Sequence, residues 1–211
     1  MARHDDLREA MVERQIRRRG IDDPAVLAAF RQVPREAFVP EALQEFAYED
    51  GPLPIGEGQT ISQPYIVALM IDAAQIAPGA RVLEVGAGSG YAAAVLSRIA
   101  GEVFAVERHA PLAEAARRRL RELGYHNVEV IAGDGSAGLP EEPPFDAILV
   151  AACGDRVPEP LREQLAVGGH LVMPVGGEGV QSLICITRTA QDAWSEQVLA
   201  PVRFVPLVRS P

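Results

Sequence analysis

The sequence contains no lysine, and all 20 of its basic side chains are arginines. This absence excludes Walker-type phosphate loops, Schiff-base catalysts and pyridoxal phosphate enzymes, because each of these needs a lysine. Aromatic residues are also scarce, at 5%. No apolar run approaches the ~20 residues that span a bilayer. The net charge of −9 argues against nucleic acid as a partner, since phosphate neutralisation needs a basic surface.

Cysteine and histidine are equally sparse. Cys153 and Cys185 both lie in apolar runs, and we interpret them as buried free thiols in a reducing compartment. The N-terminus carries mixed charges and lacks the apolar centre of a signal peptide. We therefore expect a cytoplasmic monomer with no membrane segment. The histidines have no metal-ligand spacing, so we expect no metal site; they are His4, His109, His126 and His170.

Strands alternate with helices from Ala80 onward, which predicts a parallel sheet with crossover helices. The expected strands are 81–85, 102–106, 128–132, 146–151 and 170–175, and the expected helices are 91–99, 110–123 and 158–165. Two further strands, 181–189 and 196–204, should pair antiparallel at the sheet edge. The predicted fold is therefore a doubly wound, Rossmann-like α/β sheet that is mostly parallel.

The first 78 residues predict a helical cap instead. Helices are expected over 5–19, ending at Gly20, and from Asp23 onward. Residues 51–58 are rich in proline and glycine and predict an ordered loop, followed by a helix over 65–76. We expect a single domain of residues 1–211. Its parts are a cap with a substrate segment (1–78), a cofactor-binding core (79–175) and C-terminal edge strands (176–211).

The arginines near residue 19 do not indicate a nucleic-acid site. Glu13 lies four residues before Arg17, which is the spacing of a helical ion pair. Basic residues also suit the C-terminal end of a helix. We interpret this stretch as a solvated helix face.

Three glycines alternate directly after the first core strand: Gly86, Gly88 and Gly90. Glycines in such a turn let a ligand approach the backbone. A dinucleotide-binding turn would need its third glycine at position 91, where Tyr91 stands. A nucleophile elbow, G-x-S-x-G, fails around Ser89, because Ala87 and Tyr91 stand where its two glycines would be. What remains is Glu84 followed by G-x-G-x-G, which resembles the nucleotide-binding turn of class I S-adenosylmethionine methyltransferases.

Acidic residues close the next two strands. Glu107 lies about twenty residues after the first glycine, and its carboxylate can accept from both hydroxyls of a ribose. Asp134 can accept from an adenine amino group, while the adjacent Gly135 allows close approach. Carboxyl ends of parallel strands meet at one edge of a sheet. We therefore expect S-adenosylmethionine to bind there, with Arg108 also in contact.

The segment 59–64, Gln-Thr-Ile-Ser-Gln-Pro, offers hydroxyl, amide and backbone donors but no charged base. An amine or phenol acceptor usually calls for a base that removes a proton. A carboxylate with a pKa near ~4 is already an anion at neutral pH. The segment therefore suits a carboxylate acceptor. From spacing alone, Thr60 and Ser62 could equally cap the helix that begins near Pro64.

Residues 53–68 closely resemble the signature of the protein-L-isoaspartate O-methyltransferases. They read Leu-Pro-Ile-Gly-Glu-Gly-Gln-Thr-Ile-Ser-Gln-Pro-Tyr-Ile-Val-Ala. The segment 59–64 is highly specific to that family, whereas the glycine turn is shared by many methyltransferases. The resemblance extends over nearly the whole chain. Other segments that carry it are 12–16, 34–40, 82–91, 145–150, 168–172 and 202–207.

This resemblance implies repair of aged proteins. The family methylates the α-carboxylate of L-isoaspartyl residues, which form when Asn or Asp cyclises to a succinimide. The resemblance implies catalytic roles for Ser62 and Thr60, binding of ribose and adenine by Glu107 and Asp134, and a place for Gln181 in the cofactor pocket. The expected cofactor contacts are Gln59, Thr60, Ile61, Ser62, Glu84, Gly86, Gly88, Gly90, Glu107, Arg108, Asp134, Gly135 and Gln181.

The loop at 151–158 departs from the family pattern, which usually shows a small, proline-containing loop there. Asp155 and Arg156 could read the charge of a peptide, or simply pair with each other in solvent. This leaves two alternatives open. One is a carboxyl methyltransferase for a dedicated peptide, and the other is a non-catalytic module that binds S-adenosylmethionine.

Overall fold

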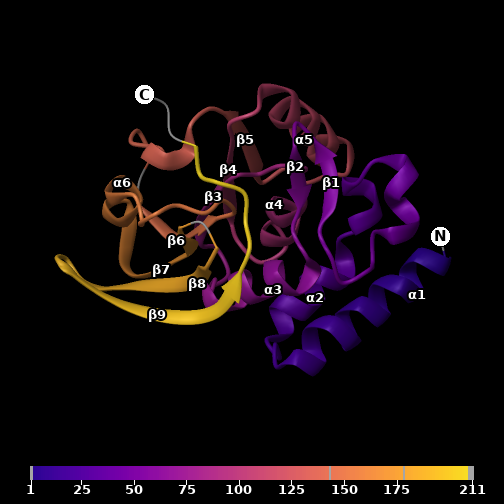
Figure 1. Ribbon diagram of the computed structural model, residues 1–211, viewed down its shortest axis with the longest axis horizontal. Helices are drawn as coiled ribbons and strands as arrows, with labels where there is room; N and C mark the ends of the chain where they lie inside the picture. The colour runs from indigo at the N-terminus through magenta and orange to yellow at the C-terminus, as the bar shows by residue number, and fades with distance from the viewer. Residues whose placement is uncertain (1, 143, 178, 209–211) are drawn as a thin grey trace.

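The computed structural model describes residues 2–142, 144–177 and 179–208 (Figure 1). Its main sheet has seven strands in the order β5-β4-β3-β6-β7-β8-β9. Pairing is parallel from β5 to β7 and antiparallel from β7 to β9. This confirms the predicted Rossmann-like sheet and its antiparallel edge. The strands are β3 (Arg81–Val85), β4 (Glu102–Glu107), β5 (Val128–Ala132), β6 (Phe145–Val150), β7 (Leu165–Gly176), β8 (Gln181–Ala190) and β9 (Ala193–Val202).

Strand β3 lies inside this sheet between β4 and β6, and its apolar run is buried on both faces, as expected of a parallel strand. Val82 packs into the hydrophobic cluster on one face, and Leu83 packs into the cluster on the other. The strand order reverses between β3 and β6, which are neighbours but not consecutive. In open α/β sheets, ligands bind in the crevice beyond the strand ends at such a reversal.

The α-helices that contribute to the larger cluster include α2 (Pro24–Gln32), α3 (Pro64–Ala73), α4 (Tyr91–Leu96) and α5 (Ala110–Glu122). Helix α5 buries Leu112, Ala116 and Leu120, whose spacing places them on one helix face. The short α6 (Glu159–Glu163) contributes Leu161 to the opposite cluster. Helices α4 and α6 are both shorter than predicted. Within the described ranges, no helix combines the length and apolar character needed to traverse a bilayer.

The first predicted helix is helical throughout but is not one α-helix. Helix α1 (Ala2–Met11) continues as a π-helical turn (Val12–Ile16) and a 3-10 turn (Arg17–Arg19), and it ends at Gly20 with φ of 95°. The apolar spacing does not distinguish these hydrogen-bonding patterns, because Val12 and Ile16 are buried in either case. Two further 3-10 turns follow α2, namely η3 (Arg35–Phe38) and η4 (Glu41–Phe46).

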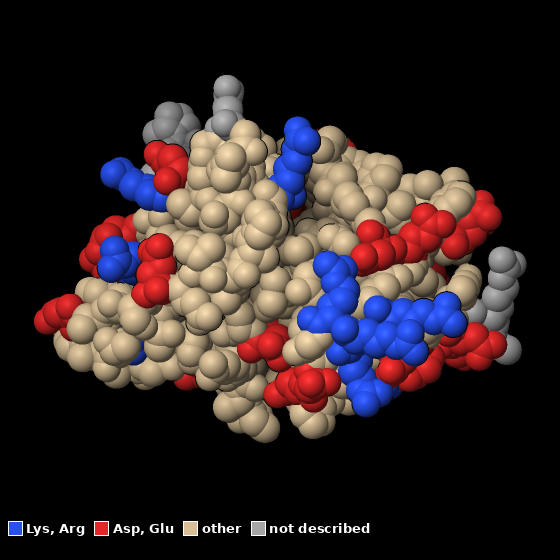
Figure 2. Space-filling model, turned by 60° about the horizontal axis from the view of Figure 1, so that its bottom comes forward, with Lys and Arg blue, Asp and Glu red and all other residues tan. Residues whose placement is uncertain are grey.

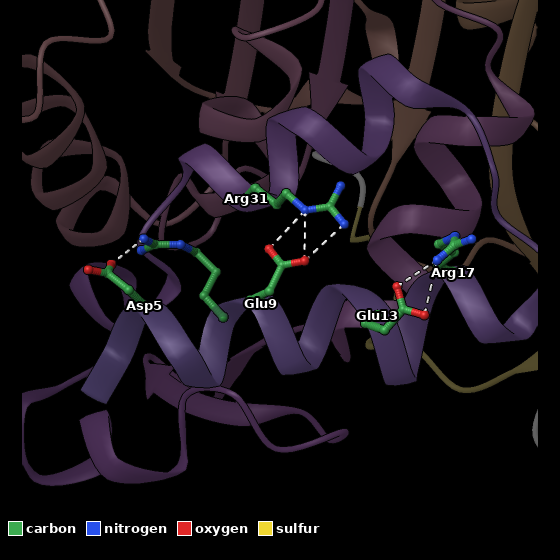
Figure 3. Close-up of polar contacts among 6 residues, drawn as sticks. Asp5, Glu9, Glu13, Arg17 and Arg31 are labelled. Carbon is green, nitrogen blue, oxygen red and sulfur yellow. Dashed lines mark hydrogen bonds and ion pairs between the residues drawn. The ribbon is translucent and has the colours of Figure 1, made fainter. Parts of the chain in front are cut away.

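Charged side chains of α1 and its extension form ion pairs with one another and with α2 (Figure 3). The predicted pair of Arg17 and Glu13 forms at 3.0 Å, and Arg31 of α2 reaches Glu9 of α1 at 2.9 Å. On the face shown in Figure 2, basic side chains lie beside acidic ones. Pairs between exposed side chains contribute about 0–1 kcal/mol each. The helix face is therefore a solvated, charge-paired surface, as predicted.

The sequence predicts a loop over residues 51–58, but residues 53–56 form a strand. Strand β1 (Leu53–Gly56) pairs antiparallel with β2 (Gln59–Ile61) in a small separate hairpin. Glu57 and Gly58 adopt φ of 51° and 69°, which suits the tight turn of a two-residue hairpin. Proline and glycine are rare in strands, so their abundance here concealed the strand pattern.

The side-chain amide of Asn127 ties the end of α4 to the start of β4. Its nitrogen lies within 3.0–3.3 Å of the carbonyl oxygens of Ser97, Ala100 and Gly101. One side chain thereby satisfies carbonyls in the connection that leads from the glycine turn to the second core strand.

Aromatic packing joins the cap to the core, and this contact can be tested. Phe38 is 1% exposed and meets the ring of Tyr91 edge-on at 5.6 Å. Replacing Phe38 with Ala should lower the free energy of unfolding by about 3–5 kcal/mol, because the cavity cannot fully collapse. Phe46 ends the neighbouring 3-10 turn and is 38% exposed, so Phe46→Ala should cost less than about 1 kcal/mol. Urea unfolding of both variants measures the difference; equal losses would contradict this account.

Candidate functional site

One pocket gathers most of the predicted site residues at the carboxyl ends of β3, β4, β5 and β6. Gly90 and Gln181 are the two predicted cofactor contacts that do not line it. The eleven that do are Gln59, Thr60, Ile61, Ser62, Glu84, Gly86, Gly88, Glu107, Arg108, Asp134 and Gly135.

The glycine turn begins at the end of β3. The amides of Gly86 and Ala87 both donate to the carbonyl of Val106, at 2.8 and 3.1 Å. All three glycines have φ between 53° and 91°, which is backbone that favours glycine. A Cβ on Gly90 would meet Leu120 of α5 at 3.1 Å. Gly90 is therefore explained by the packing of α5 against the turn rather than by contact with the pocket.

The Glu107 carboxylate ends β4 and is 4% exposed. One of its oxygens accepts from the amide of Gly88, and the other accepts from the amide of His109, both at 2.8 Å. Glu107 thus fixes the glycine turn while lining the pocket. Each carboxylate oxygen has a second lone pair, so the acceptors predicted for a ribose remain available.

Glu84 is the second buried acid of the pocket and is 2% exposed. Its Oε2 atom has no hydrogen-bond partner within the described residues. Burial, together with the nearby charge of Glu107, raises the pKa of Glu84 to about 8. Without a cofactor, Glu84 therefore carries a proton at neutral pH.

Asp134 follows β5 and caps the 3-10 turn η5 (Gly135–Ala137) by accepting from the amide of Ser136 at 2.9 Å. This bond orients the carboxylate at the pocket wall. A Cβ on Gly135 would lie 2.6 Å from the side chain of Val85. The glycine is thus required where the ends of β5 and β3 come together, in addition to any close approach of a ligand.

The β1–β2 hairpin brings the predicted substrate segment to the glycine turn. A Cβ on Gly88 would meet the side chain of Ile55 at 3.0 Å, so the hairpin rests directly on the turn. The backbone carbonyl of Ser62 accepts from the guanidinium of Arg35 at 2.9 Å. The residue that caps α3 is Gln63, and it makes no side-chain capping bond. The alternative that Thr60 and Ser62 serve as the helix cap therefore does not hold.

The sequence interpretation missed the C-terminal wall of the pocket, which is formed by residues 205–208. The carbonyl of Val205 accepts from the amide of Cys153 at 2.8 Å, and the amide of Leu207 donates to the carbonyl of Cys153 at 2.7 Å. Arg108 donates to the carbonyl of Val208 at 3.1 Å. The segment 202–207 carries part of the family resemblance, but its mostly apolar side chains give no sign of a place in the site.

Gln181 stands behind this wall instead of lining the pocket. Its side chain accepts from the amide of Phe204 at 2.6 Å and donates to the carbonyl of the same residue at 3.2 Å. Gln181 therefore holds the start of the C-terminal segment. Asp155 and Arg156 also lie outside the pocket, in a separate groove beside α6 and β9.

A family model described as protein-L-isoaspartate(D-aspartate) O-methyltransferase (PCMT) matches residues 6–211. The chain belongs to this family. A protein-L-isoaspartate O-methyltransferase of Methylorubrum extorquens is 60% identical over 204 residues, covering 97% of this chain and 89% of that protein. Protein-L-isoaspartate O-methyltransferase 1 of Rhodopseudomonas palustris is 59% identical over 202 residues, covering 95% and 82%.

Solved protein-L-isoaspartate O-methyltransferase structures share the fold. One from Plasmodium falciparum, in complex with S-adenosyl-L-homocysteine, matches with a TM-score of 0.84 and 29% identity, covering 96% of this chain and 99% of that one. A second matches with a TM-score of 0.83 and 33% identity, covering 94% and 65%. The family uses S-adenosylmethionine as its methyl donor.

The buried Glu84 makes a prediction about pH. Its pKa is raised from an ordinary 4.5 to about 8, so the folded protein retains a proton that the unfolded chain loses. Stability from this group is therefore fully present below about pH 4.5 and is lost as pH rises toward 8. In Glu84→Gln the neutral side chain removes this dependence. The wild-type stability minus that of the variant should fall by at most about 1.4 kcal/mol per pH unit across the window.

Urea unfolding of both proteins without cofactor, at pH values from 5 to 8, measures this difference. A stability difference that stays constant with pH would show that Glu84 is ionised throughout.

Proposed function

We propose that this chain transfers the methyl group of S-adenosylmethionine to the α-carboxylate of L-isoaspartyl residues in damaged proteins and peptides, and so initiates their repair. The observation that supports this most directly is the position of the β1–β2 hairpin. It places Thr60 and Ser62 in the same pocket as the glycine turn and its acids. Donor and acceptor segments thus face one cavity.

The pocket residues fit the cofactor. Glu107 and Asp134 offer carboxylate acceptors to ribose and adenine, as the resemblance implies, and glycines expose the backbone between them. Glu84 lies beside them and would meet the cationic part of the cofactor as a carboxylate. When bound, the cofactor supplies a methyl group on a positively charged sulfur. Gln59 to Ser62 would close the site over it, and Gln181 would act by holding residues 203–208.

The chemistry needs orientation more than a base. The acceptor carboxylate is already ionised at neutral pH, and the reaction removes two opposite charges. Water stabilises the separated charges, so a pocket that excludes water and aligns the oxygen with the methyl carbon favours transfer. Alignment of this kind supplies about 7–11 kcal/mol in favourable cases. The hydroxyls of Thr60 and Ser62 are the side-chain donors that the hairpin brings to this task.

We further propose that the protein works in the cytoplasm as a monomer and that nucleic acid is not a partner. The buried free thiols of Cys153 and Cys185 support a reducing compartment. The net charge of −9 opposes binding to phosphate backbones. Within its single domain, we assign the substrate segment to residues 1–78, the cofactor core to 79–175 and the edge strands to 176–211.

The decisive measurement of the activity uses peptide pairs that differ only in an aspartyl or an isoaspartyl linkage. Methyl transfer from labelled S-adenosylmethionine should occur with the isoaspartyl member of each pair and not with its aspartyl twin. Varying the residues that flank the linkage tests the dedicated-peptide alternative. Activity with only one sequence would support that alternative, and cofactor binding without any transfer would support a non-catalytic module.

If Ser62 acts at the reacting centre, replacing it should change kcat much more than the affinity for the cofactor product. Ser62→Ala should lower kcat by at least about tenfold, because it removes a donor at the reacting centre. The affinity for S-adenosylhomocysteine, measured by calorimetry, should change by less than about twofold, because the acids and glycines that hold the cofactor remain. Ser195→Ala, an exposed serine on β9, is the matched control and should leave both unchanged. Equal losses in kcat and cofactor affinity would refute the assigned role.

A further inference from the structure

Arg35 is a fully buried guanidinium directly behind the substrate segment. It opens the 3-10 turn η3 and has 0% exposure. Its Nε atom donates to the carbonyl of Ala47 at 2.8 Å, and one terminal nitrogen donates to the carbonyl of Ser62 at 2.9 Å. The side chain therefore ties the last part of the cap to the backbone of the proposed catalytic serine.

No ion pair within the described residues joins Arg35 to a carboxylate, and its other terminal nitrogen has no hydrogen-bond partner. The guanidinium instead lies 4.8 Å from the centre of the Tyr91 ring. Burial lowers the pKa of Arg35 from its ordinary value. Arginine nevertheless stays protonated in proteins at neutral pH. Among the residues that the structure describes, no carboxylate thus neutralises this buried positive charge.

Such a charge is costly for a residue that only joins two carbonyls. The penalty for burying an ion in a protein is several kcal/mol, even after relaxation. Two charge-assisted hydrogen bonds and the face of Tyr91 offset part of it. A neutral amide could also donate to a carbonyl without this penalty. The charge is therefore better explained by an anion that arrives from outside the chain.

The pocket offers a place for that anion. Its acids, Glu84, Glu107 and Asp134, surround the glycine turn, where a positively charged donor would be favoured. Arg35 lies behind Ser62, which lines the cavity, and its guanidinium also packs against Tyr91 of the same lining. Electrostatic effects of a buried charge are weakly screened, because little water lies between. The acids of the pocket thus favour a positively charged donor, and the guanidinium behind Ser62 favours a negatively charged acceptor.

We propose that Arg35 is a positioning residue that holds Ser62 in place and gives the acceptor end of the pocket its preference for a carboxylate over a neutral amide of the same shape. This inference rests on the proposed function, because it takes the isoaspartyl carboxylate as the anion. Arg35 would thus select the acceptor in two ways: it holds the backbone of Ser62, and its positive charge attracts a carboxylate.

The test compares two peptides that are blocked at both ends. One carries an isoaspartyl residue with its free α-carboxylate, and the other carries the same residue with that group as a neutral carboxamide. Their dissociation constants are measured by calorimetry in the presence of S-adenosylhomocysteine, which prevents turnover. The proteins are the wild type, Arg35→Lys, Arg35→Gln, Arg35→Met and the control Arg31→Gln. Arg31 is a partly exposed arginine of α2 that pairs with Glu9.

The wild type and Arg31→Gln should bind the carboxylate peptide at least about tenfold more tightly than the carboxamide peptide. A preference of this size is what a hydrogen bond to a charged group typically contributes. Arg35→Gln and Arg35→Met should reduce this ratio to below about threefold, with S-adenosylhomocysteine affinity within about twofold of the wild type. Arg35→Lys keeps the charge and should retain most of the ratio. Its kcat should fall, because lysine cannot reproduce the forked hydrogen bonds to two carbonyls.

Several results would overturn this inference. One is a folded neutral variant that still prefers the carboxylate peptide as strongly as the wild type does. Another is a parallel loss of peptide selectivity and cofactor affinity, which indicates a purely structural role. If both neutral variants fail to fold, Arg35→Lys decides. Loss of its preference for the carboxylate peptide refutes the inference. A retained preference with a lowered kcat supports it. A wild type that binds the isoaspartyl peptide without preferring it refutes this inference alone. A wild type that binds neither peptide refutes the proposed function as well.

Discussion

The carboxylate of Glu107 joins the end of β4 to the glycine turn after β3, and the pocket depends on that junction. Its two oxygens accept from the amides of Gly88 and His109, so the turn cannot shift without breaking a buried, charge-assisted hydrogen bond. The hairpin rests on the same turn through Ile55. The placement of the acceptor segment is therefore set by an acid that is distant from it in the sequence.

The pocket also separates charge. Two acids lie together at the glycine turn, and one of them, Glu84, has a pKa raised to about 8 by burial and by the other's charge. The buried guanidinium of Arg35 holds the backbone of Ser62, which lines the same pocket. The proposed donor carries a positive charge and the proposed acceptor a negative one. A site that offers both charges orients both reactants before any bond changes, and methyl transfer then needs no proton acceptor.

The sequence could predict those site residues whose chemical type is distinctive and which follow directly after a predicted strand. Glu107, Asp134 and the glycines were identifiable because parallel strands deliver their carboxyl ends to one edge. The hairpin at 53–61 was not, because its prolines and glycines conceal strand alternation. The wall at 205–208 is apolar and is placed by backbone bonds to Cys153, so no side-chain pattern marks it. Gln181 acts through Phe204, a relationship that only the folded chain reveals.

The clamp made by Asn127 has a consequence for the durability of the protein itself. Isoaspartate forms when the side-chain carbonyl carbon of an asparagine or aspartate is attacked by the backbone nitrogen that follows it. Asn127 is the only asparagine in the sequence. Its amide is held toward three carbonyls in the connection between α4 and β4, and this restrains the rotation that the attack requires. At its one asparagine, the fold thus protects the chain against the lesion that its family corrects in other proteins.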